Sequence, residues 1–168
     1  MAVIQPIGQP ENDSEALAIR RLGETLPDDW LILHNFEVCT GRGFPYEFDV
    51  VVVGDWAVYH LEVKGYRGAI NGDARTWTLD NGAVYPSPIP LANKKSKILR
   101  ERIAKANASL RDVFVETVIL LSDDRAAVKV KDPQARRIQR IDEVERALRD
   151  PAWLPVKTDS IARHRVDI

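Results

Sequence analysis

The chain has 168 residues, of which 45% are hydrophobic, and its 24 basic and 25 acidic residues give a formal net charge of -1. This length and apolar content suit one compact domain with a sizeable core and argue against two independent domains. The near-neutral charge excludes a global basic footprint, so any contact with nucleic acid has to come from a local patch.

Cys39 is the only cysteine, so the chain cannot form an internal disulfide. We find no signal peptide and no apolar run of membrane-spanning length. A reducing, cytoplasmic setting without a membrane partner is therefore expected. The single cysteine and the three scattered histidines show no zinc-ligand spacing.

The first elements are expected to be an irregular lead-in and a helix. Residues 1–10 hold two Pro and one Gly, and Ser14 is expected to cap a helix that ends near Leu26. On a helical wheel Glu15 falls on the apolar stripe that contains Ile19 and Leu22. This acid is either a functional group on the buried side or a first-turn acid favoured by the helix dipole.

Three strands follow, over residues 30–38, 46–53 and 56–64, and they predict an antiparallel meander. The second and third strands are rich in β-branched and aromatic residues and are separated by Gly54-Asp55. Two such runs with a short glycine-containing break are typical of a β-hairpin.

The hairpin gathers ionisable side chains on one face. A two-residue turn pairs Asp49 with His60 and Glu47 with Glu62, and paired or alternate residues share a face. One face then carries Glu47, Asp49, His60, Glu62 and Lys64, whereas the other carries Phe48, Val50, Val52, Tyr59, Leu61 and Val63. A slip of one residue would disperse the cluster. The charged face is either an ordinary solvated surface or a site whose partly covered acids hold a cation.

The next segment contains the candidate nucleic-acid contacts. Tyr66, Arg67 and Trp77 are either the border of a nucleic-acid groove or ordinary packing residues. A helix is predicted from about Leu91 to Leu110. Residues 91–111 hold seven basic residues and one acid, a net charge of +6. The candidate phosphate contacts are Lys94, Lys95, Lys97, Arg100 and Arg67, although a solvated helix face is also often charged.

Residues 113–121 are almost continuously apolar and predict a strand buried on both faces, with the preceding helix as its crossover. A short strand is predicted at residues 128–130, and Asp142 with Glu145 predicts a capping box for a helix through residue 148. We expect residues 1–150 to form the single domain, and residues 151–168 to be a C-terminal extension that starts a further region of a longer protein.

The order helix, three strands, basic helix and apolar strand resembles the restriction-endonuclease-like core known by its PD-(D/E)xK motif. Within that superfamily, residues 11–121 resemble the nuclease-related domain. The motifs that carry the resemblance are Leu26-Pro27-Asp28-Asp29-Trp30, Phe48-Asp49-Val50-Val51-Val52, Tyr59-His60-Leu61-Glu62-Val63-Lys64-Gly65 and Pro90 before a lysine-rich helix. The resemblance implies an α/β fold (αβββαβ) with a mixed central sheet flanked by helices. It also implies a metal-dependent phosphodiesterase, commonly joined to other DNA-processing modules.

Carried over residue by residue, the resemblance makes Asp49 and Glu62 the metal ligands, Lys64 the catalytic lysine and Glu15 the helix acid. Members of the family often have Gln where this sequence has Asn93, which leaves the contact made by that Gln in doubt. The backbone carbonyl of Val63 is a candidate third ligand.

The chemistry of these side chains agrees with the resemblance. Carboxylate oxygens on Asp49 and Glu62 suit Mg²⁺ or Mn²⁺, and Glu15 is the candidate acid for a second ion. An unperturbed lysine is a poor base at neutral pH, so an electrostatic role is favoured for Lys64. The leading hypothesis is a nuclease acting on DNA rather than RNA. The alternatives are a module that binds nucleic acid or a partner protein without cutting, and a purely structural domain.

Overall fold

The computed structural model describes residues 1–41, 43–156 and 161. Its α-helices are α1 (Asp13–Thr25), α2 (Ile89–Ala106) and α3 (Val144–Arg149), and its short 3-10 helices are η1 (Ala108–Leu110), η2 (Ala135–Arg137) and η3 (Pro151–Trp153). The strands are β1 (Val3–Pro6), β2 (Leu31–Val38), β3 (Tyr46–Val53), β4 (Val58–Lys64), β5 (Ala69–Asp73), β6 (Thr76–Leu79), β7 (Val84–Pro86), β8 (Val115–Leu121), β9 (Ala127–Lys131) and β10 (Ile138–Arg140).

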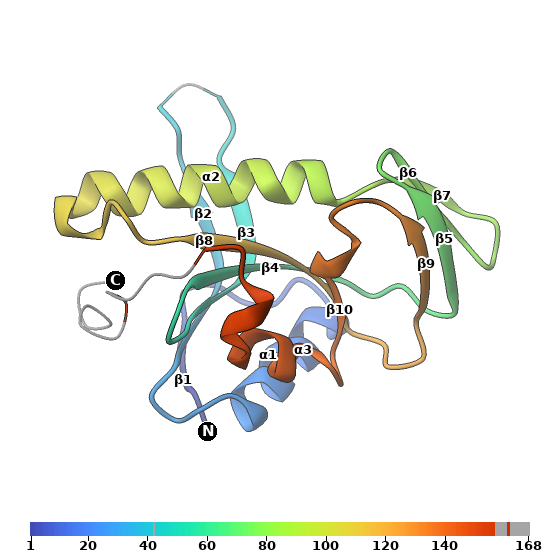
Figure 1. Cartoon of the computed structure of the whole chain (residues 1–168), viewed down its shortest axis with the longest axis horizontal. Coiled ribbons are helices and arrows are strands. Elements are labelled where there is room, and N and C mark those ends of the chain that lie inside the picture. The colour runs from blue at the N-terminus through green and yellow to red at the C-terminus, as the bar shows by residue number, and fades with distance from the viewer. Residues whose placement is uncertain (42, 157–160, 162–168) are drawn as a thin grey trace.

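The centre of the molecule is a mixed six-stranded sheet in the order β1-β2-β3-β4-β8-β10. Helix α2 covers one face of this sheet, and α1 and α3 lie on the other face (Figure 1). Strands β7, β6, β5 and β9 form a separate four-stranded sheet at one end of the molecule (Figure 1). The structure therefore confirms the predicted α/β fold with a mixed central sheet flanked by helices.

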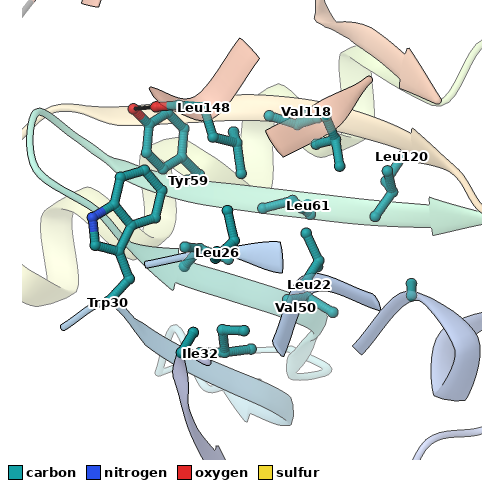
Figure 2. Packing of buried hydrophobic residues seen from close by; sticks show 14 of the residues in the cluster. Leu22, Leu26, Trp30, Ile32, Val50, Tyr59, Leu61, Val118, Leu120 and Leu148 are labelled. Atoms are coloured by element: carbon teal, nitrogen blue, oxygen red, sulfur yellow. Dashed lines mark hydrogen bonds between the residues drawn. The ribbon is translucent and has the colours of Figure 1, made fainter. Parts of the chain in front are cut away.

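The core beneath α1 and α3 is built from large, fully buried side chains. Trp30, Tyr59 and Leu61 of the sheet region meet Leu22 and Leu26 from the α1 segment (Figure 2). Full burial of one such side chain contributes about 1.5–3 kcal/mol, so this cluster stabilises the sheet strongly. The Tyr59 hydroxyl also donates a 2.8 Å hydrogen bond to the carbonyl of Leu148, which fixes α3 against β4.

The predicted meander of β2, β3 and β4 is confirmed, but the predicted turn is wrong. Val53 pairs with Val58, and the connection has four residues, closed by a 3.1 Å hydrogen bond from the Gly54 amide to the Ala57 carbonyl. The register therefore differs by two residues from the predicted pairing of Val53 with Trp56. Because side chains alternate with a period of two, this shift leaves every β4 side chain on its predicted face.

The predicted alternation fails at one point in the meander. Phe48 packs under α2 with Val51, not with Val50 on the opposite face as the strict alternation predicted. The change of face occurs between Phe48 and Val50, opposite Asn35, which has a left-handed backbone with φ of 51° and is the one residue of β2 that forms no pair with β3, although the register is the same on both sides of it. Such a conformation is uncommon for a residue other than glycine and often marks a functional region.

The N-terminal segment also differs from the prediction. Residues 3–6 form an edge strand that pairs in parallel with β2, where an irregular lead-in was expected. Helix α1 is capped by Asn12, whose side chain accepts a 3.1 Å hydrogen bond from the Glu15 amide, rather than by Ser14. Asn and Ser are about equally good caps, so sequence alone does not separate them.

The two later helices begin differently from the prediction. Helix α2 starts at Ile89 with Pro90 in its first turn, a position where the missing amide hydrogen has no cost. The predicted capping box at Asp142 does not form, because Asp142 accepts hydrogen bonds from Arg140 instead. No side chain caps α3.

The segment after β4 forms the second sheet. Trp77 lies in β6 with no exposed surface, so it is a core residue and does not border a groove. The predicted strand at residues 128–130 is confirmed as β9, which pairs in parallel with β5. All seven residues of β8 are buried, which confirms the strand predicted from the apolar run at residues 113–121.

The C-terminal segment continues into the core. Leu154 packs in the cluster beneath α1 and α3, and Ile161 packs in the cluster beneath α2. Residues 157–160 and 162–168 lie outside the described residues, so the division at residue 150 stays a prediction. None of the helices in the described ranges has the length and apolar composition needed to cross a membrane.

Candidate active site

A polar cleft lies where β3 and β4 separate. The two strands pair only over Val50–Val53 of β3, and beyond this point the cleft has a volume of about 670 Å³. Its walls come from the start of α1, the ends of β3 and β4, and α2. The charged side chains that line it are Glu11, Asp13, Glu15, Glu47, Asp49, Glu62, Lys64, Arg67 and Lys95. The cleft therefore gathers all four predicted catalytic residues, and its acids outnumber its bases.

Asp49 crosses the gap between the diverging strands. Its Oδ2 accepts a 2.7 Å hydrogen bond from the Val63 amide of β4. Burial, and then the nearby charge of Glu62, raise the pKa of Asp49 to about 7. The ionised carboxylate is therefore held in a place where positive charge would stabilise it.

Glu62 is buried between two ammonium groups. Its Oε1 lies 2.9 Å from Lys64 Nζ, and its Oε2 lies 2.7 Å from Lys95 Nζ. Although burial opposes ionisation, the two lysines lower the pKa of Glu62 below its usual value. The Glu62 charge in turn raises the pKa of Lys64, again against the effect of burial. Lys64 is therefore firmly protonated, which fits an electrostatic role and not that of a base.

Glu15 also lines the cleft and accepts three hydrogen bonds. Its Oε2 accepts from the Glu11 amide and from Asn35 Nδ2, each at 2.9 Å, and its Oε1 accepts from Asn12 Nδ2 at 2.7 Å. Its burial on the α1 stripe agrees with the wheel. The left-handed backbone of Asn35 is thus coupled to the orientation of this acid.

Comparison with known proteins assigns the chain to a family. Residues 10–122, more than half of the chain, match the family described as nuclease-related domain. The chain belongs to this family. Every predicted catalytic residue lies inside the matched range, as does the whole of β3, β4, α2 and β8.

Two curated relatives contain a similar segment. The chain is 24% identical over 144 residues to the probable kinase PglW of Streptomyces coelicolor, and this alignment covers 82% of the chain and 9% of that protein. It is 35% identical over 66 residues to an uncharacterized protein of Bacillus anthracis, 38% of this chain and 31% of that protein. The chain thus spans a small part of either relative. No solved structure matches it significantly.

The donor atoms of this nuclease-related domain fit a hard divalent cation. The carbonyl of Lys64 accepts a hydrogen bond from Ser122 at the β8 side, so the carbonyl of Val63 points to the opposite edge of β4, toward Asp49. Asp49 Oδ1 has no hydrogen-bond partner among the described residues. Two carboxylates and one carbonyl are the ligands that Mg²⁺ and Mn²⁺ prefer.

A three-carboxylate site is not formed. Among residues 1–41, 43–156 and 161, no group of three or more His, Cys, Asp or Glu side chains has an arrangement that could hold a metal ion. Glu15 therefore shares the cleft with Asp49 and Glu62 but does not join them as a ligand set. A second ion at Glu15 stays a prediction that this geometry does not favour.

His60 is a buried residue next to Glu62, and its contacts are those of a structural residue. It has no exposed surface, its Nδ1 lies 3.0 Å from Ser96 Oγ, and its ring packs edge-on against Phe48. Burial lowers the pKa of His60 to about 4, so the ring is neutral at physiological pH.

The candidate nucleic-acid contacts do not form one surface. Lys95 is buried against Glu62, and its role beside that acid was not apparent in the sequence. Lys94 lies 5.2 Å over the Tyr46 ring, whereas Arg67 lies at the cleft and pairs with Asp123 at 3.1 Å. Lys97 and Arg100 line a separate cavity on the β8 side of α2.

Replacement of Asp49 with Asn is expected to stabilise the metal-free domain at high pH. The amide oxygen can still accept from the Val63 amide, while the buried charge is lost. Because the folded pKa of about 7 exceeds the ordinary value of 3.8, wild-type stability falls as pH rises between these values. At pH 8 in chelator, urea unfolding should show Asp49→Asn to be about 2–4 kcal/mol more stable than wild type, since each pKa unit between 3.8 and 7 corresponds to about 1.4 kcal/mol. At pH 4 the two proteins should agree, and a constant difference at both pH values would contradict this account.

Proposed function

We propose that this nuclease-related domain is a Mg²⁺- or Mn²⁺-dependent nuclease that hydrolyses phosphodiester bonds, with DNA as the favoured substrate. The observation that supports it most is the convergence of Asp49, Glu62 and Lys64 in one cleft at the point where β3 and β4 diverge. A purely solvated hairpin face does not explain a buried Glu62 held by two lysines. Family membership supports a nuclease-related role independently of this geometry.

A small number of protein groups would carry out the proposed reaction, each with its own role. Asp49, Glu62 and the Val63 carbonyl would hold the cation, which when bound polarises the phosphate and acidifies a water molecule. Lys64 supplies a fixed positive charge for the phosphoryl oxygens as negative charge builds on them. Lys95 holds the second oxygen of Glu62, so the carboxylate is oriented before substrate arrives.

The net negative charge of the cleft affects how substrate can bind there. Six acids and three bases line the cleft, so without a cation a phosphodiester meets repulsion there. Asp49 and Glu62 would hold a divalent cation, whose charge would reduce that repulsion. Substrate binding in the cleft should therefore itself depend on the metal.

The context of the domain within a larger protein is part of the proposal. The chain spans 9% of PglW, whose name describes a probable kinase. We infer that a nuclease-related domain of this size acts as one module beside others, in a DNA-processing or defence protein.

A non-catalytic module is the second candidate, and one observation favours it. Both oxygens of Glu62 are engaged by ammonium groups, so the internal lysines can neutralise this acid without any metal. In that case the domain binds nucleic acid or a partner protein and does not cut. Salt-sensitive DNA binding together with an absence of Mn²⁺ binding in calorimetry would support this function over the first.

Cleavage of labelled DNA and RNA with Mg²⁺, with Mn²⁺ or with chelator tests the leading proposal. Cleavage should require the metal, and Lys64→Ala should reduce its rate about a hundredfold because a charge beside the phosphate is lost. Lys129→Ala on β9, an exposed lysine outside the cleft, is the matched control and should cleave like wild type. Equal rates for Lys64→Ala and wild type would overturn the catalytic role of Lys64.

A further inference from the structure

A second cavity lies on the β8 side of α2, apart from the cleft between β3 and β4. It has a volume of about 230 Å³, and its residues come from α2, from Phe114 and the start of β8, and from η2. The lining residues are Asn93, Ser96, Lys97, Arg100, Phe114, Val115, Thr117 and Arg137. Three of these side chains are cationic and none is acidic, so the cavity has the opposite electrostatic character to the cleft.

The cations of this cavity differ from the other basic residues of the domain. Lys97 and Arg100 are exposed and form no ion pair with any acid in the part of the chain that the structure describes. By contrast, Arg140 and Arg149 are each paired with acids in their own segment. Like charges that converge on a small space repel one another, and a bound anion removes this cost.

Arg137 is fixed in place before any ligand binds. Its Nε lies 3.0 Å from Glu116 Oε1, and its Nη1 donates to Asn93 Oδ1 and Gln134 Oε1. The Nη2 group has no hydrogen-bond partner among the described residues. A guanidinium held in this way loses little conformational entropy on binding, and its Nη2 group can donate to a phosphate oxygen.

The inner wall of the cavity adds neutral polar groups. The hydroxyls of Ser96 and Thr117 lie 2.7 Å apart, and both residues are buried. Hydroxyls beside cationic side chains are common partners of phosphate oxygens. The volume is below the range of about 300–1,000 Å³ that is typical of drug-sized ligands, so a small anionic group fits better than a whole nucleotide.

We propose that this cavity is a phosphate-binding site, which takes either inorganic phosphate or the terminal phosphate monoester of a nucleic acid. Lys97 and Arg100 supply mobile charge at the rim, and Arg137 supplies a fixed donor inside. The site is separate from the cleft and requires no metal. It can therefore be present whether or not the domain cleaves nucleic acid.

Titration with inorganic phosphate in the presence of chelator tests the proposal, with chloride at matched ionic strength as the reference. Phosphate should raise the melting temperature in a saturable manner and should give a binding isotherm in calorimetry. The double variant Lys97→Gln/Arg100→Gln should weaken binding at least about tenfold, because two charge-assisted contacts are lost. Both side chains are exposed, so this variant should fold. Arg102→Gln/Lys105→Gln removes the same charge from the same helix outside the cavity and should bind like wild type.

Oligonucleotides of one sequence with a 5′-phosphate, a 3′-phosphate or only hydroxyl ends identify the source of the phosphate. Tighter binding of one phosphorylated oligonucleotide, lost in Lys97→Gln/Arg100→Gln, assigns the site to a nucleic-acid end. Binding of inorganic phosphate without such a preference assigns it to the free anion, and both results support the proposal. No saturable effect of phosphate, or an equal effect in both double variants, would overturn it. Because chelator is present throughout, the result is independent of nuclease activity.

Discussion

Replacement of both Arg136 and Arg137 with Gln is expected to destabilise the domain by about 3–5 kcal/mol. The two arginines pair with Glu116, which lies in β8 and has no exposed surface. Arg136 Nη2 lies 3.0 Å from Glu116 Oε2, and Arg137 Nε lies 3.0 Å from Glu116 Oε1. Without them the carboxylate keeps, among the residues that the structure describes, only the hydrogen bond from the Thr117 amide. A buried charge that loses its partners costs more than the pairs themselves contribute.

Urea unfolding of the double variant measures this cost, and a third substitution separates its origin. Adding Glu116→Leu to Arg136→Gln/Arg137→Gln should recover most of the loss, because the unpaired charge is then removed. Arg140→Gln/Arg149→Gln breaks exposed pairs of the same kind and should cost about 1 kcal/mol or less. Equal losses in the two double variants, or no recovery with Glu116→Leu, would show that the buried charge is not responsible.

The strand that contains Glu116 could be predicted from the sequence, but the arginines that pair with Glu116 could not. The apolar run at residues 113–121 predicts a strand buried on both faces, and that strand is β8. The same run contains Glu116, and an acid inside a buried strand requires a cationic partner. The partners lie 20 residues further along the chain, in a segment with several arginines and no strong pattern. Only the fold shows which of these arginines reach the carboxylate.

The ionisable residues of β4 were placed on the correct face although the predicted turn was wrong, and the reason is physical. The sequence predicts the strands well, because β-branched residues dominate both, but the length of the connection depends on backbone geometry that Gly54-Asp55 does not determine. The actual four-residue turn shifts the pairing by two, which preserves the faces of β4. The strand pattern does not predict the change of face at Phe48, which lies opposite the left-handed backbone of Asn35, the residue whose side chain donates a hydrogen bond to Glu15.

Lys95 illustrates the limit for side chains on a helix. Residues 91–111 contain seven basic residues, which together predict a phosphate-binding face. The count of charges does not show that one of them, Lys95, is buried. Lys95 is 8% exposed and bonds to Glu62, whereas its neighbour Lys94 is exposed. Helix periodicity places Lys95 on the buried stripe, four residues before Leu99, but it does not reveal that Glu62 is its partner.

Glu62 bonds to both lysines and is a proposed ligand of the cation, so its replacement should have the largest effect on cleavage. It is 7% exposed, and both of its oxygens are bonded to ammonium groups. Gln keeps the shape of the side chain but removes the charge, and its amide nitrogen has to face one of the two lysines. The proposed cation site would then lack one of its two carboxylates, while Lys64 and Lys95 repel one another across a neutral group.

Glu62→Gln is therefore expected to reduce metal-dependent cleavage about a thousandfold, equivalent to about 4 kcal/mol of transition-state stabilisation. Calorimetry should show that Mn²⁺ affinity falls in parallel, and the circular dichroism spectrum should be unchanged. Glu37→Gln removes an exposed acid from β2 outside the cleft and should have wild-type activity and Mn²⁺ binding. A Glu62→Gln variant that cuts at the wild-type rate would mean that Glu62 serves only as the partner of two lysines. Lost cleavage with intact Mn²⁺ binding would instead place the cation elsewhere and leave Glu62 to position Lys64 beside the phosphate.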